Sequence, residues 1–195
     1  PGDVHEDAAA RRLAAAVCGS GVVAGPPAAS RVNLLAEADG VVHIDEGRLL
    51  EINQIDGLTI ATRPGHALVR ARKRVATIKI IPFAVPEADL RAAEAVGRAG
   101  SPIIMLAPLQ RWLVGVALVG SLAARDRIMG GVYPAIAARV EALGSAICGV
   151  RYVPADEAAV AAAIGELHTA GAQLLIIAGE TSIMDRDDIT PQGIR

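Results

Sequence analysis

The sequence predicts an α/β protein in two parts, a β-rich module followed by an open domain with a parallel sheet. The first part alternates short apolar segments with turn signals, at a spacing typical of a small sandwich or barrel. The second part alternates continuous apolar strands with helices, which is the pattern of a parallel sheet that carries helices on its faces. With 195 residues, the chain has room for a small domain and part of another.

Composition excludes several classes of function. Hydrophobic residues make up 52% of the chain, which is too many for intrinsic disorder. The formal net charge of −2 lacks the excess of basic residues that sequence-blind nucleic-acid binding needs. Aromatic residues make up only 2%, too few for a platform that stacks single-stranded bases, so the core is aliphatic and we expect no nucleic-acid partner.

The sequence also indicates a cellular compartment for the protein and predicts that the chain is part of a longer polypeptide. The two cysteines, Cys18 and Cys148, fit small buried residues in a reducing compartment better than a disulfide framework. No signal peptide is recognisable, and the strongest apolar run, Leu113–Val119, is far shorter than the roughly 18 residues that span a bilayer. We therefore expect a cytoplasmic protein without a membrane partner. A first residue other than Met, and an end just after a Thr-Pro pair, predict a piece of a longer polypeptide.

The first part is expected to occupy residues 1–107. It opens with a helix that Asp3 caps and that runs to about Val17. Five short strands separated mostly by glycine-containing turns follow, at Val32–Leu35, Val41–Ile44, Leu58–Ala61, Ala67–Val69 and Val75–Ile81. A linking helix over Glu87–Ala99 and a strand at Ser101–Ala107 complete this part.

The second part, residues 108–195, repeats strand and helix. Its elements are expected at Leu113–Val119, Pro134–Leu143, Ala146–Arg151, Asp156–Ala170 and Leu174–Ala178. Crossovers between parallel strands are right-handed, and ligands bind outside the carboxyl ends of such strands. The loops that leave those ends are therefore the first place to look for a site.

The third of these loops, residues 179–190, is the most informative. It begins Gly-Glu-Thr-Ser and ends Asp-Arg-Asp-Asp-Ile-Thr. Its glycine, hydroxyls and amides suit a phosphate, and its carboxylates suit a divalent cation. The same residues are equally typical of a polar surface loop followed by an acidic helix cap.

The segment Leu174–Pro191, LLIIAGETSIMDRDDITP, resembles the molybdopterin-binding domain of proteins that make the molybdenum cofactor. That superfamily includes molybdopterin adenylyltransferases and molybdenum-insertion enzymes. Its signature is a strand, then Gly-Gly-Thr-Ser or Gly-Gly-Thr-Gly, a short spacer, and Asp-x-Thr-Pro. The resemblance covers about residues 113–195. Residues 31–102 resemble, through less specific motifs, the amino-terminal region of bacterial molybdopterin-binding proteins, some of which carry a nucleotidyltransferase domain further on.

The resemblance implies a three-layer α/β/α domain, incomplete here at its C-terminus, that binds molybdopterin by its phosphate. It assigns to the cofactor-binding loops Gly120, Ser121, Gly179, Glu180, Thr181 and Ser182. Asp188 matches the family's metal-linked acidic residue and is the candidate catalytic residue, with Mg²⁺ as the implied metal. Asp185, another carboxylate of the same loop, is the second candidate metal ligand.

Two departures from the family pattern bear on catalysis. Glu180 stands where the family has a second glycine, and its carboxylate would either repel a phosphate or bind Mg²⁺. Two acidic positions of the family are unfilled, with Ser121-Leu122 at the first and Gly130-Gly131 near the second. Asp126 is the nearest carboxylate to the second position, but its register is wrong.

Three functions therefore stay open. The first is a transferase of molybdenum-cofactor biosynthesis, either a molybdopterin nucleotidyltransferase or a molybdenum-insertion enzyme. The second is a non-catalytic pterin carrier that serves a nucleotidyltransferase on the same or another chain. The third is a generic nucleotide-binding α/β domain. Because the parallel sheet looks incomplete, its exposed edge is expected to pair with a second copy in a homo-oligomer.

A basic cluster in the β-rich module has two interpretations. It consists of Arg63, Arg70, Arg72, Lys73 and Arg74. One interpretation is a solvated hairpin face, and the other is an anion site. The four histidines are scattered without the spacing of metal ligands.

Overall fold

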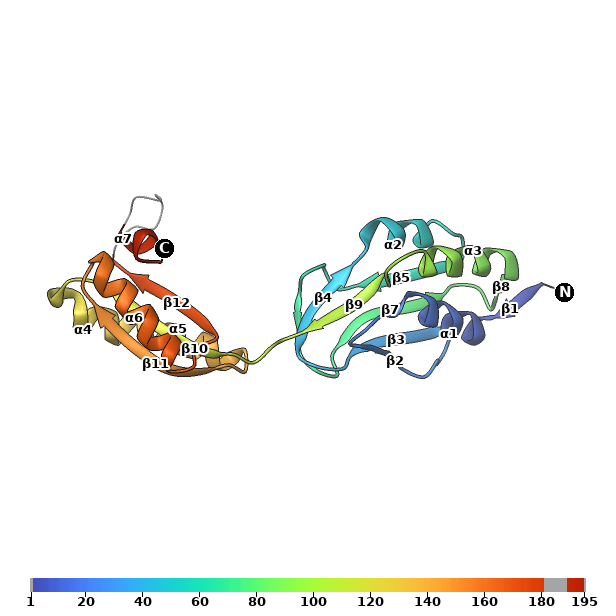
Figure 1. The fold of residues 1–195 in the computed structure, drawn as a ribbon. Helices are drawn as coiled ribbons and strands as arrows, with labels where there is room; N and C mark the ends of the chain where they lie inside the picture. Colours follow the sequence, from blue (N-terminus) through green and yellow to red (C-terminus); the bar gives the residue numbers. More distant parts are fainter. Residues whose placement is uncertain (1, 181–188, 195) are drawn as a thin grey trace. The chain divides into compact units, whose positions relative to one another are not determined.

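The computed structural model describes residues 2–180 and 189–194, and it divides the chain into two compact units (Figure 1). Unit 1 is Pro1–Leu109 and unit 2 is Gln110–Arg195. This division falls between Leu109 and Gln110, whereas the sequence predicts the boundary between residues 107 and 108.

Unit 1 holds two antiparallel sheets of four and three strands, in the orders β2-β3-β7-β5 and β6-β4-β9. Their strands are β2 (Val22–Ala24), β3 (Arg31–Ala36), β4 (Gly40–Ile44), β5 (Leu58–Thr62), β6 (Leu68–Val69), β7 (Arg74–Ile80) and β9 (Ile104–Pro108). A further short pair joins β1 (Asp3–His5) to β8 (Ala84–Pro86).

The start of one helix in unit 1 differs from the sequence prediction, and another helix of this unit was not predicted. The helices are α1 (Glu6–Val17), α2 (Glu46–Asn53) and α3 (Glu87–Arg98). Asp3 does not cap α1, because it belongs to β1, and His5 Nδ1 instead accepts the Asp7 N–H at 3.3 Å. The segment expected as a turn at Glu46 begins α2, since the Asp45 carboxylate accepts the Arg48 N–H at 3.1 Å.

The core of unit 1 packs α1 and α3 against one face of the four-stranded sheet (Figure 1). Strands β4 and β9 of the three-stranded sheet add Val42, Ile104 and Leu106 to the same buried cluster. Along β3, the alternate residues Val32, Leu34 and Ala36 are buried. A Cβ on Gly97 of α3 would lie 3.0 Å from the Cβ of Ala16, so small residues let α1 and α3 pack closely. Helices therefore contribute to this core together with strands of both sheets, whereas the sequence predicts a module of strands without helices in its core.

Unit 2 is built on a parallel three-stranded sheet in the order β11-β10-β12, which confirms the predicted parallel sheet. Its elements are β10 (Leu113–Val119), α4 (Arg125–Arg127), α5 (Tyr133–Ala142), β11 (Ala146–Val153), α6 (Glu157–Thr169), β12 (Leu174–Gly179) and α7 (Ile189–Gly193). A π-helical turn over Ile128–Val132 leads into α5. The predicted cap of α6 is confirmed, because the Asp156 carboxylate accepts the Ala159 N–H at 2.9 Å.

The helices α5 and α6 cover opposite faces of this sheet. Val116 and Leu118 of β10 pack in one cluster with Val140 of α5. The intervening residue Ala117 packs in another cluster with Leu167 of α6. Within the described residues β11 and β12 are the outer strands, and their pairing with a second copy stays a prediction.

Strand β11 carries a bulge opposite the start of β10. Val114 pairs with Ile147, but the next residue, Gly115, pairs with Gly149, so Cys148 is an extra residue. Ile147, Val150 and Tyr152 consequently share one face of the sheet, although two residues lie between Ile147 and Val150. Both cysteines are free thiols and half-buried.

No helix in the described part of the chain is long and apolar enough to cross a membrane.

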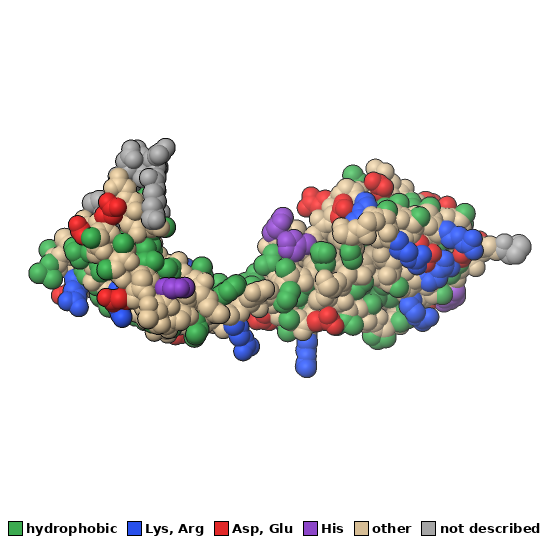
Figure 2. Space-filling view, viewed as in Figure 1, with side chains coloured by type: hydrophobic (Ala, Val, Ile, Leu, Met, Phe, Trp, Pro, Cys, Tyr) green, Lys and Arg blue, Asp and Glu red, His purple; other side chains and the backbone are tan. Residues whose placement is uncertain are grey.

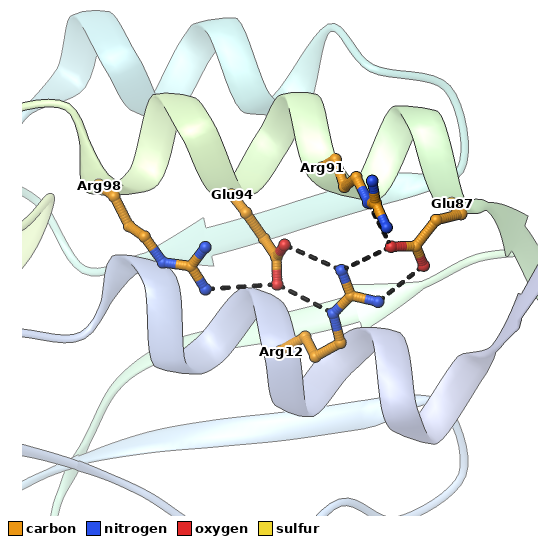
Figure 3. A network of polar contacts seen from close by, with 5 residues as sticks. All are labelled: Arg12, Glu87, Arg91, Glu94 and Arg98. Atoms are coloured by element: carbon orange, nitrogen blue, oxygen red, sulfur yellow. Dashed lines mark hydrogen bonds and ion pairs between the residues drawn. The ribbon is translucent and has the colours of Figure 1, made fainter.

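Arginine 12 connects the two packed helices of unit 1 (Figure 3). Its guanidinium donates to the Glu94 carboxylate at 2.9 Å through two nitrogens, and to the Glu87 carboxylate at 2.7 and 3.1 Å. Arg91 forms an ion pair with Glu87, and Arg98 forms one with Glu94. The bonds from Arg12 lower the pKa of Glu87 to about 2 and lower that of Glu94 as well. The Glu94 side chain is only 8% exposed, so its charge depends on Arg12.

We expect Arg12→Met to lower the free energy of unfolding of unit 1 by about 2 kcal/mol at neutral pH, because the buried Glu94 loses its two closest bonds and keeps only Arg98, at 3.5 Å. Denaturant unfolding against Arg11→Met, which changes an exposed neighbour, provides the comparison. The carboxylates have lowered pKa values when folded, so the stabilisation is complete above about pH 4.5 and is lost as the pH falls towards about 2. The deficit of the variant should shrink over that window, and equal losses in both variants would contradict this role for Arg12.

Candidate functional site

The carboxyl ends of β10 and β12 form a topological switch point in unit 2. The chain leaves β10 for α5, on one face of the sheet. After β12 it continues to α7, which lies against α6 on the other face, since a Cβ on Gly193 would approach Val160 at 2.9 Å. Connections that diverge to opposite faces leave a crevice between two strand ends, where open α/β sheets bind ligands.

Backbone bonds hold the three strand ends together at this switch point. The Gly120 N–H donates to the Val153 carbonyl at 3.0 Å, and the Glu180 N–H donates to the Val119 carbonyl at 3.2 Å. The first residues after β10 and β12 are therefore neighbours, as the sequence predicts from the strand pattern. A Cβ on Gly179 would lie 2.0 Å from the Val119 carbonyl oxygen, so only glycine fits there.

The Glu180 carboxylate turns towards Ser121. One of its oxygens accepts the Ser121 N–H at 3.3 Å and the Ser121 hydroxyl at 3.4 Å. Both distances are at the long end for hydrogen bonds, and the residues are exposed. The two donors at the end of β10 thus face a negatively charged group supplied by the chain itself.

Tyr152 is a site residue that the sequence analysis missed. Its hydroxyl donates to the Ser121 carbonyl at 2.7 Å, and the Arg125 guanidinium lies 5.8 Å from the centroid of its ring. The sequence analysis missed it because it ended the strand at Arg151, whereas β11 runs to Val153. With the longer strand, Tyr152 pairs in register with Leu118, next to the loop after β10.

Glycine 120 leaves just enough space for these side chains. A Cβ at this position would lie 2.6 Å from the Tyr152 hydroxyl and 2.8 Å from a Glu180 carboxylate oxygen. Gly130 and Gly131 are different, because a Cβ on either has no atom within 4 Å. Those two glycines belong to the turn into α5 and do not line a close contact.

The structure brings together four of the predicted cofactor-binding residues and does not address the others. Gly120, Ser121, Gly179 and Glu180 meet at the switch point. The predicted residues of the following loop lie outside the described residues; these are Thr181, Ser182, Asp185 and Asp188. Within the described part of the chain, no three His, Cys, Asp or Glu side chains come close enough to hold a metal ion.

Two of the histidines that looked scattered in the sequence are in contact. His43 and His66 of unit 1 lie edge to face, with ring centroids 5.4 Å apart. Both are exposed. Figure 2 shows the side chains coloured by type, with histidines in purple. The pair has no third metal-ligating side chain among the described residues, so it does not make a metal site by itself.

Comparison of the chain with protein-family models, with curated proteins and with solved structures found no match.

We expect Gly120→Ala to destabilise unit 2 by about 1 kcal/mol, because the new methyl group displaces Tyr152 and Glu180 from their bonds to Ser121. Gly130→Ala makes the same chemical change in open space within a helical turn, and we expect it to be neutral or slightly stabilising. Denaturant unfolding of the two variants measures the difference. Equal effects would mean that the loop after β10 tolerates a side chain at position 120.

Proposed function

We propose that unit 2 binds molybdopterin, a phosphorylated pterin dithiolene, through its phosphate group at the carboxyl ends of β10 and β12. The resemblance of Leu174–Pro191 to the molybdopterin-binding domain supports the ligand. The arrangement of the sheet supports the position, because the crevice lies at its switch point. The same proposal gives unit 2 the three-layer α/β/α fold of that family.

One observation carries this proposal: Ser121 already binds a negatively charged group, the carboxylate of Glu180. Its N–H and hydroxyl both point at a Glu180 carboxylate oxygen. A phosphate oxygen has the same sign of charge and accepts the same donors. The end of β10 therefore provides a small anion site that an incoming phosphate can take over from Glu180.

Neighbouring residues fit a phosphate at this place. Gly120 has no side chain, so the backbone can approach a ligand closely. Arg125 adds positive charge beside the Tyr152 ring, within reach of the same loop. The hydroxyls of Thr181 and Ser182 complete the phosphate loop in the proposal, through their match to the family signature.

In this arrangement Glu180 competes with the ligand. A carboxylate about 6 Å from a phosphate repels it by roughly 3 kcal/mol at an effective dielectric near 20, and by less where water screens the charges. Binding therefore requires Glu180 to leave Ser121. The carboxylate then either turns to solvent or joins Mg²⁺, the metal that the resemblance links to Asp188.

A non-catalytic pterin carrier is the second candidate function. It is favoured by the turn at Gly130-Gly131, which offers no carboxylate where the family has an acidic residue. Incubation with molybdopterin, Mg²⁺ and ATP or CTP separates the two functions. A nucleotidyltransferase releases a nucleotidylated pterin and pyrophosphate, whereas a carrier binds the pterin and leaves the nucleotide intact.

We expect Glu180→Gln to tighten the binding of molybdopterin by roughly tenfold, because the amide keeps the size of the side chain and removes the repulsion. Isothermal titration calorimetry without and with Mg²⁺ measures the change. Glu141→Gln is the matched control, because that glutamate is exposed near the end of α5, away from the strand ends that form the crevice.

Weaker binding of Glu180→Gln only in the presence of Mg²⁺ would make Glu180 a metal ligand. An unchanged affinity in both conditions would exclude Glu180 from the pocket. Absence of molybdopterin binding by the unmodified chain, under conditions where both units are folded, would overturn the proposed function itself.

A further inference from the structure

In the described part of unit 1 the helices pack on one face of the four-stranded sheet, and the other face carries several positively charged side chains. Its outward side chains include Arg31 of β3, Arg74 and Lys79 of β7, and Arg63 directly after β5. The strands β2, β3, β5 and β7 contain no aspartate or glutamate at all. Within these four strands the charge is therefore of one sign, in a chain whose net charge is −2.

The positive charges on this face are not neutralised within unit 1. Arg31 lies directly opposite Lys79 in the pairing of β3 with β7, an arrangement that costs stability because like charges face each other. Among the described residues, none of the four cations forms an ion pair with a carboxylate. Arg12, Arg48 and Arg70 of the same unit do form such pairs.

A pocket of about 250 Å³ lies at one end of this face. It is lined by residues 61–63 and 74–77, so both Arg63 and Arg74 border it. The Arg63 Nε donates to the Arg74 carbonyl at 3.0 Å. This bond fixes the Arg63 guanidinium across the two strands and leaves its two terminal nitrogens to meet a ligand.

We propose that this pocket binds the phosphate group of a phosphorylated small molecule. Two guanidinium groups at the rim of one pocket match the geometry of a phosphate, which accepts paired N–H bonds. The volume is below the roughly 300–1,000 Å³ typical of pockets that enclose a whole ligand, so it suits a phosphate group with the rest of the molecule outside. This site is in unit 1 and does not depend on the function proposed for unit 2.

Two other occupants fit the face less well. The strands β2, β3, β5 and β7 contain no aromatic residue, so the face offers no platform for stacking the bases of a nucleic acid. An added peptide strand would pair with the outer edge of β5. There the Asn53 side chain already bonds the Ile60 N–H at 2.7 Å and the Ile60 carbonyl at 3.0 Å.

The test is calorimetric titration of the full chain with inorganic pyrophosphate and, separately, with ATP. We expect Arg63→Gln and Arg74→Gln each to weaken pyrophosphate binding by about tenfold, and the double variant to abolish this site. Arg11→Gln removes an exposed arginine from α1, on the other side of the sheet, and should bind as the unmodified chain does. Any phosphate site in unit 2 is identical in all these proteins, so it does not contribute to the difference.

Several results would overturn the proposal. They are equal affinities in the double variant and in Arg11→Gln, and binding of ATP without binding of pyrophosphate. Binding of a single-stranded oligonucleotide more tightly than pyrophosphate, lost in the double variant, would replace the small molecule by a nucleic acid.

An Arg63→Lys, Arg74→Lys double variant keeps the charge and the fold, and we expect it to bind with intermediate affinity. Full affinity in that variant would show that charge alone, and not the paired guanidinium groups, holds the anion.

Discussion

The geometry of unit 2 depends on the complete enclosure of one strand, β10. Its backbone pairs with β11 on one side and β12 on the other, and its residues from Val114 to Val119 are buried, with a helix on each face. A strand in this position has no freedom to slide, because any shift would expose apolar side chains and break hydrogen bonds on both edges. The point where β10 ends therefore fixes where Gly120 and Ser121 stand, and the neighbouring strand ends bring Glu180 and Tyr152 to them.

The sequence predicts the parts of the fold whose signals are strong and local. The bounds of β10 match its continuous apolar run, and α6 begins where Asp156 can cap it. The short elements are harder to predict, because several residues compete for a cap or a pairing. At the N-terminus β1 pairs with β8, far along the chain, so Asp3 is drawn into a strand and is not available as a cap.

The candidate site was predictable as a meeting of loops but not in its detail. Apolar strands alternating with helices are enough to bring the residues after β10 and β12 together. The hydrogen bonds of Glu180 to Ser121, and the contact of Tyr152 with the same residue, depend on register and on the direction of side chains. Register is a non-local property set by the pairing of strands, and no pattern within a single strand records it.

The bulge in β11 has a consequence for how the chain tolerates changes of length. The extra residue Cys148 shifts the alternation of the strand by one position, and Tyr152 lies on the face from which its hydroxyl reaches Ser121. Loss of Cys148 would leave a regular strand in which Gly149 follows Ile147 and still pairs with Gly115, so Arg151 and Tyr152 would keep their faces and partners. Loss of Arg151, by contrast, would turn Tyr152 to the other face. Relatives with this site should therefore vary in the presence of a residue at position 148 but keep a single residue between Val150 and Tyr152.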